Sequence, residues 1–115
     1  MSAAGSQTEP PFHLLLEQEE IGVAQTALNL LIADEARQGE IRRIAREVLA
    51  AIESAPREGS VSSVPLTPPQ MKITHTAVRL LLDDLRREHA EERELLRGIL
   101  DKLPDEHTMR AIELE

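Results

Sequence analysis

Hydrophobic residues recur at steps of three and four along two long segments of this 115-residue chain, which is the pattern of amphipathic helices. The segment 70–103 contains no proline and one glycine, Gly98, so we predict one continuous helix over its length. The segment 12–53 shows the same periodicity from Gln18 onwards, but Gly39 near its centre is expected to kink or end the helix.

The remaining residues are predicted to be connections and ends. Residues 54–69 contain four prolines and one glycine, which predicts a linker without helix. Residues 1–11 predict a disordered leader. The tail, 104–115, fits a short helix as well as a strand, and residues 12–16 (Phe-His-Leu-Leu-Leu) fit an extended piece as well as a first helical turn.

The start of the second helix is marked by side chains suited to a helix N-terminus. Thr67 is a candidate N-cap, Pro68 occupies the first helical position, and Gln70 completes a capping box with Thr67. The helix is therefore expected to begin where the linker ends.

The two segments resemble each other when one is shifted by 50 residues, or by 51 beyond Gly39. Residues 26–34 and 76–84 share the run Thr-Ala-x-x-Leu-Leu-x-x-Asp. Any two amphipathic helices of this composition match to some degree, yet this run favours an internal duplication. Each unit would then comprise an extended entry ending in Leu16 or Leu66, a helix cap and one long helix.

The composition favours helices packed on helices. Hydrophobic residues make up 41% of the chain, with one Phe and no Trp or Tyr, so the core is aliphatic. We predict an all-α fold in which two long antiparallel helices form a hairpin. Such a hairpin leaves each apolar stripe half covered, and a homodimeric four-helix bundle would cover both stripes. The residues expected at this interface are Leu28, Leu31, Val78, Leu81, Leu85, Leu95 and Ile99.

Charge and missing residue types exclude several functions. Thirteen basic and 21 acidic residues give a formal net charge of −8, which argues against binding to nucleic acid. The chain has no cysteine, so disulfides and thiolate sites are excluded. No run of about 18 apolar residues predicts a membrane span, and the first residues lack a signal-peptide pattern. We therefore expect a cytoplasmic protein with no membrane or nucleic-acid partner.

The polar middle of both predicted helices offers an alternative. Antiparallel packing would place Glu35 opposite Glu88, His89 and Glu92, and carboxylates with imidazole inside a bundle are typical metal ligands. The Glu-x-x-His pairs that such bundles use are absent from the sequence. A polar layer that sets helix register is the simpler interpretation, and a metal-binding helical bundle is the alternative.

The sequence contains no recognisable arrangement for catalysis. All six serines lie in the leader or the linker, and the glycine pattern of a phosphate-binding loop is missing. We therefore expect no enzymatic activity and no cofactor. The sequence favours a non-enzymatic helical interaction, scaffold or regulatory module. Its partner would be a second copy of the chain or another helical protein.

Overall fold

The computed structural model describes residues 12–34 and 36–104. The predicted leader, almost all of the predicted tail and Glu35 lie outside the described residues. The elements follow one another in this order: β1 (Phe12–Glu17), α2 (Gln18–Ala33), α3 (Gly39–Ser54), β2 (Arg57–Glu58), β3 (Val61–Leu66), α4 (Pro68–Asp84), the 3₁₀ turn η1 (Arg87–His89) and α5 (Ala90–Lys102).

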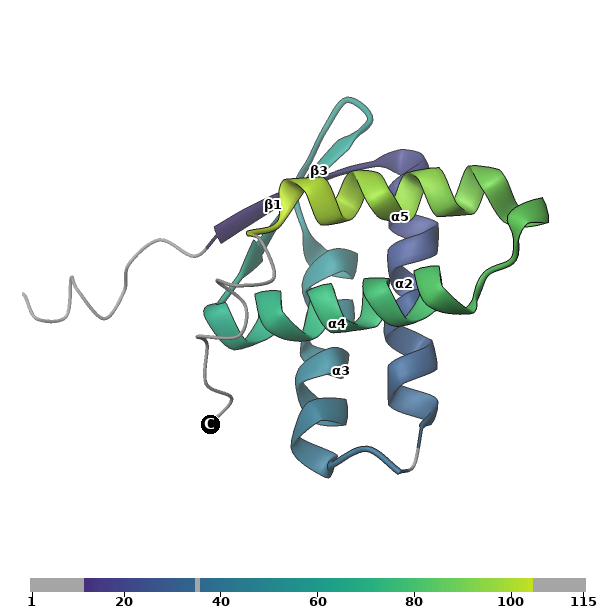
Figure 1. Ribbon diagram of the computed structural model, residues 1–115. Coiled ribbons are helices and arrows are strands. Elements are labelled where there is room, and N and C mark those ends of the chain that lie inside the picture. Colours follow the sequence, from purple (N-terminus) through teal and green to yellow (C-terminus); the bar gives the residue numbers. More distant parts are fainter. Residues whose placement is uncertain (1–11, 35, 105–115) are drawn as a thin grey trace, which may run out of the picture.

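The prediction of an all-α fold is wrong, and so is the prediction of a two-helix hairpin completed to a four-helix bundle. The chain is mostly helical but contains a three-stranded antiparallel sheet in the order β1-β3-β2. In Figure 1, α2 and α3 run side by side, and α4 crosses both of them. The sheet packs against these helices through one face.

The strands are formed by segments whose alternate residues are apolar. In β1, Leu14 and Leu16 are buried, whereas Leu15 between them is exposed. In β3, Val64 and Leu66 are buried in the same way. Alternation over six residues is too short to separate a strand from a helical turn by periodicity. The sequence therefore left residues 12–16 open between an extended piece and a helical turn, and it did not predict the sheet.

The segment predicted as a linker therefore holds a β-hairpin, β2 and β3, joined at Gly59 and Ser60. Gly59 has a φ of 66°, whereas Ser60, like every other non-glycine residue that the structure describes, has no positive φ, so the two-residue loop matches a type II′ turn. β2 pairs only with Val61 and Ser62. Pro65 consequently lies where β3 has a single neighbouring strand, which is the position that proline tolerates.

The segment 70–103, predicted as one helix, forms two. α4 ends at Asp84 and α5 begins at Ala90. The polar residues Glu88 and His89 interrupt the apolar stripe because they belong to an exposed turn and not to a layer inside a helix. The chain folds back there because the apolar residues of α5, including Leu96 and Ile99, are then buried in the common core.

Arginine side chains hold both folded-back helices in the same way. Arg42 of α3 donates from Nε to the carbonyl oxygen of Ile32 at 2.9 Å. Arg93 of α5 donates to the carbonyl oxygens of Leu82 and Leu85 at 3.1 and 3.0 Å. Each guanidinium thus satisfies carbonyl groups at the end of the preceding helix, which have no partner within that helix.

The prediction that Thr67 caps the second helix is confirmed, with Thr67 accepting from the Gln70 backbone at 3.3 Å and Gln70 Oε1 accepting from the Thr67 backbone at 3.0 Å. A second capping box occurs 50 residues earlier. There Glu17 is the N-cap of α2, and Glu20 Oε1 accepts from the Glu17 backbone at 2.8 Å. Helices α2 and α4 therefore both begin with a capping box.

The two halves of the chain form corresponding β-α-α units. α2 and α4 begin 50 residues apart, and α3 and α5 begin 51 residues apart. Leu14 of β1 pairs directly with its equivalent, Val64 of β3, at the centre of the antiparallel ladder. An antiparallel pair centred on equivalent residues has two-fold symmetry. The units are therefore related by an approximate two-fold axis through the Leu14–Val64 pair.

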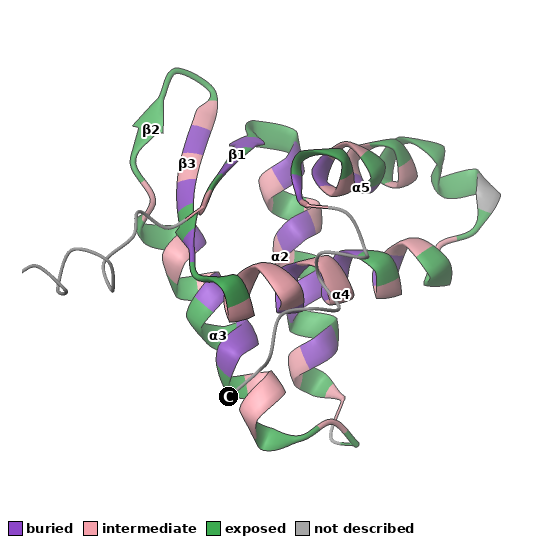
Figure 2. Cartoon of the chain, turned by 60° about the vertical axis from the view of Figure 1, so that its left-hand side comes forward, coloured by how far each residue is buried: buried purple, intermediate pink, exposed green. Residues whose placement is uncertain are grey.

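The core is aliphatic, as the composition predicts, and both units contribute to it. Equivalent residues are buried in both units: Ala27 and Ala77, Leu31 and Leu81, Val48 and Ile99. Figure 2 shows that the buried residues gather on the sides of the elements that face one another.

Candidate functional site

Few large hydrophobic side chains of the described residues reach the surface. Leu15 on the sheet is 50% exposed and Leu30 on α2 is 39% exposed. Single exposed leucines need no functional explanation. Leu30 is the more informative of the two, because it lines a groove built by both units.

We call this hollow the axial groove. It is open to solvent, has a volume of about 480 Å³ and lies between the C-terminal parts of α2 and α4. The six residues that line it are Leu30, Ala33 and Asp34 from α2, and Leu80, Asp83 and Asp84 from α4. Each of the three α2 residues has an equivalent on α4, 50 positions later in the sequence, that also lines the groove. The groove therefore lies on the approximate two-fold axis.

The helix geometry explains why these residues meet. α4 crosses α2 near the middle of the molecule, and beyond this crossing their C-terminal ends diverge (Figure 1). Leu31 and Leu81 point into the core beneath, while the adjacent Leu30 and Leu80 lie about 100° further round each helix. The groove is therefore apolar at its centre and acidic where the helices end.

The carboxylates of the groove are not equivalent in their contacts. Asp34 accepts a hydrogen bond from the Ala36 backbone at 3.1 Å, and its Oδ2 lies 3.4 Å from Nε of Arg37. For Asp83 and Asp84, in contrast, no ion pair is found with any residue that the structure describes. Among the described residues, the α4 end of the groove therefore carries more carboxylates without an ion-pair partner than the α2 end.

The dipole of α4 makes the electrostatic potential at this end of the groove more negative. The last turn of α4 carries no basic residue, and a carboxylate near a helix C-terminus faces the negative end of the helix dipole. This placement of Asp83 and Asp84 is locally unfavourable. Such departures from local stability rules are concentrated at functional sites.

The structure places the predicted interface residues mainly inside the chain. Five of the seven are buried in the core formed by the two units: Leu28, Leu31, Val78, Leu81 and Ile99. The other two, Leu85 and Leu95, are partly buried, and of these two Leu85 packs against that core. The aliphatic stripes thus cover one another within one chain.

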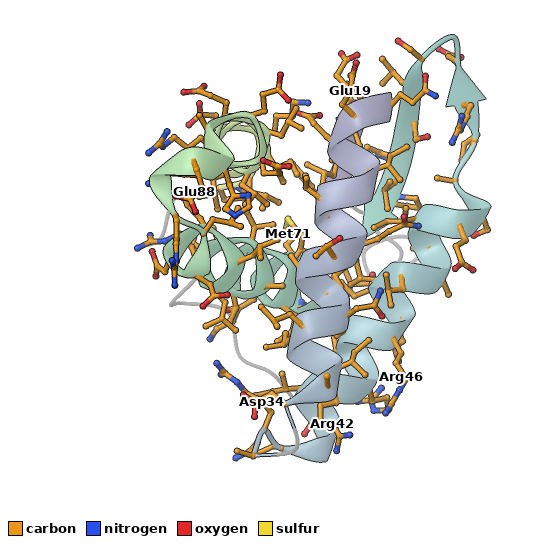
Figure 3. All side chains as sticks on the ribbon, turned by 90° about the vertical axis from the view of Figure 1, so that its right-hand side faces the viewer. Glu19, Asp34, Arg42, Arg46, Met71 and Glu88 are labelled. Atoms are coloured by element: carbon orange, nitrogen blue, oxygen red, sulfur yellow. The ribbon has the colours of Figure 1, made fainter. Side chains whose placement is uncertain are left out.

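The residues of the predicted metal alternative do not form a cluster in the described part of the chain. Nδ1 of His89 and Oε1 of Glu92 are 4.0 Å apart, and both side chains are about half exposed. No group of three or more metal-ligating side chains is found among the described residues. Figure 3 shows Glu88 well separated from Asp34 at the end of α2, and Glu35 lies outside the described residues.

Sequence reasoning did not identify the axial groove. Leu30, Leu80, Asp34 and Asp84 all belong to the run that the two segments share at a shift of 50. The repeat was therefore a usable signal, because residues repeated on two crossing helices meet near a symmetry axis. The sequence analysis did not predict the break in the helix at residues 85–89. Without that break, a crossing of α2 and α4 could not be inferred.

The outer face of the sheet is a second candidate surface. Some DNA-binding proteins insert a two-stranded ribbon into the major groove, where Arg and Lys contact base edges and phosphates. The outward positions of β1 and β3 carry no Lys or Arg: His13, Leu15, Glu17, Val61, Ser63 and Pro65. This chemistry does not suit a polyanion.

Within the described residues, no helix is both long enough and apolar enough to cross a bilayer. Comparison of the chain with protein-family models, with curated proteins and with solved structures finds no significant match.

Proposed function

We propose that this protein is a non-enzymatic interaction module that binds another protein through the axial groove. The observation that carries the proposal is the position of Leu30 and Leu80, two equivalent leucines side by side in a groove that needs both units. An apolar centre with a charged rim is the common composition of a protein-binding surface.

The groove chemistry supports binding better than catalysis. Its polar side chains are three aspartates, and Asp34 is already engaged by Arg37. Asp83 and Asp84 are neighbours on one helix, so their side chains point about 100° apart and cannot act together as an acid and a base.

Photo-crosslinking tests the proposal. A photoreactive amino acid is placed at Leu30 in cells that make the protein, and an otherwise identical variant carries it at Leu15, the other exposed leucine among the described residues. We expect a defined protein adduct from position 30 that is absent from position 15. The adduct should also disappear when Leu80→Lys is added.

Two results would count against the proposal. One is the same set of adducts from both positions, and the other is an adduct at position 30 that survives Leu80→Lys. A circular dichroism melt of each variant confirms that it is folded.

A further inference from the structure

We infer that the axial groove takes a cationic amphipathic segment of a partner protein, with aliphatic side chains between Leu30 and Leu80 and an arginine or lysine against Asp83 and Asp84. This inference rests on the proposed function and adds the chemistry of the partner and the direction in which it lies.

The apolar part of the groove selects aliphatic side chains. Leu30 is 39% exposed and Leu80 is partly buried, and Ala33 beside them leaves room for a side chain from outside. Contact with these residues removes apolar surface from water, which favours binding without specifying a direction. The orientation of the bound segment must therefore be set by the charged groups of the groove.

The charges of the rim select a basic partner. All three charged groups of the groove are carboxylates, in a chain whose formal net charge is −8. A cation there would relieve the repulsion between Asp83 and Asp84 and the end of the α4 dipole. Long-range attraction would also accelerate the encounter with a basic segment.

The same charges disfavour a second copy of this chain as the occupant. A two-fold contact through the groove would place Asp34, Asp83 and Asp84 of one copy against the same residues of the other. Like charges brought together at an interface cost free energy, and no basic residue of the groove compensates them. The occupant is therefore a different protein.

The departure from symmetry gives the bound segment a direction. Position 33 is Ala where its equivalent, position 83, is Asp, and Asp34 already has Arg37 as a partner. The α4 end consequently offers two carboxylates that form no ion pair with any residue that the structure describes. The basic end of the segment should lie at α4 and its uncharged end at α2.

The test uses three peptides of about 14 residues that share leucines at helical i, i+3 and i+4 spacing. One carries arginines near one end, one carries glutamine at the same positions and one carries glutamate. Each is titrated into the ¹⁵N-labelled full chain, and amide shifts report the site and the affinity. We expect the arginine peptide alone to perturb residues 30–34 and 80–84, with affinity that falls as salt is added.

Variants of the groove separate binding from folding. The double variant Asp83→Asn and Asp84→Asn should weaken the arginine peptide about tenfold. It should also raise the melting temperature by roughly 2–6 °C, because two carboxylates leave a helix C-terminus. Asp101→Asn, an exposed carboxylate on α5, is the matched control and should leave the affinity unchanged.

A nitroxide at the arginine end of the peptide tests the direction. We expect it to broaden the amide signals around Asp84 more than those around Asp34. Equal broadening at both ends would overturn the directional part of the inference.

The outcomes distinguish this inference from the proposed function. Equal binding of the glutamine peptide, or no shift at the groove with any peptide, overturns the cationic partner. If position 30 still yields its specific crosslink, the interaction function stands without it. Self-association of the unliganded chain through the groove would identify a second copy as the occupant and would also overturn the inference.

Discussion

The ion pair between Glu20 and Lys102 leads to the most direct test of how the two units are joined. Glu20 in α2 is 6% exposed, and its Oε1 lies 2.5 Å from Nζ of Lys102 at the end of α5. The same ammonium donates to the carbonyl oxygen of Leu15 on β1 at 2.8 Å. The Lys102 side chain therefore links α5 to both β1 and α2.

The change Lys102→Met removes the charge and keeps a side chain of similar length. Breaking a fully buried ion pair costs about 3–5 kcal/mol. Lys102 is 34% exposed in its side chain, so water can replace part of the lost contact. Glu20 also keeps its hydrogen bond from the Glu17 backbone. We therefore expect the free energy of unfolding to fall by about 1–3 kcal/mol.

Urea unfolding followed by far-ultraviolet circular dichroism measures this loss, since the chain has no Trp or Tyr for fluorescence. Glu20→Gln, which keeps the capping hydrogen bond, completes a double-mutant cycle, and a coupling free energy of about 1 kcal/mol is expected. Arg97→Met, which breaks an exposed pair with Glu94, is the control and should cost less than about 0.5 kcal/mol. A Lys102→Met variant as stable as this control would refute the reasoning.

Two further sets of variants test the repeated helix ends and the packing of α5. Arg42→Met and Arg93→Met should each lower the free energy of unfolding by about 1–2 kcal/mol, and the loss should be larger for Arg93 because its side chain donates to two carbonyl groups. The control, Arg43→Met on an exposed face, should change the free energy of unfolding by less than about 0.5 kcal/mol. Equal urea midpoints for all three variants would contradict the role assigned to these hydrogen bonds. Gly22→Ala should stabilise the chain by about 0.5–1 kcal/mol, since nothing lies within contact distance of the added Cβ. Gly98→Ala should give no such gain, because its Cβ would lie 3.1 Å from Oε2 of Glu20. Thermal melts in which both variants gain stability equally would show that α5 is less closely packed on α2 than the structure indicates.

The start of α4 and a break near Gly39 could be predicted from the sequence, but the end of α4 could not. Thr67 and Gln70 cap α4 as predicted, because a capping box depends on residues within one turn. The end of α4 depends on Arg93, which lies in the next helix and reaches back to Leu82. No rule based on neighbouring residues contains that contact.

The sheet was missed for a related reason, although an extended entry before each helix was expected. Leu14-Leu15-Leu16 is a continuous apolar run, which does not by itself distinguish a strand from a helix. The distinction arises from pairing with Val64 and its neighbours, 50 residues away. Proline and glycine near those neighbours correctly excluded helix over residues 55–67, but they do not exclude a hairpin with a short edge strand.

The buried stripes bear directly on where a partner can bind. The sequence argument for a second chain was that Leu28, Leu31 and Val78 would be left half exposed by a two-helix hairpin. In the structure the second β-α-α unit covers the first, and all three side chains are fully buried. What remains for a partner is the surface that this internal pairing leaves over. On the symmetry axis that surface is the groove in which equivalent leucines from both units meet, and its acidic rim is the basis for the cationic partner that we propose.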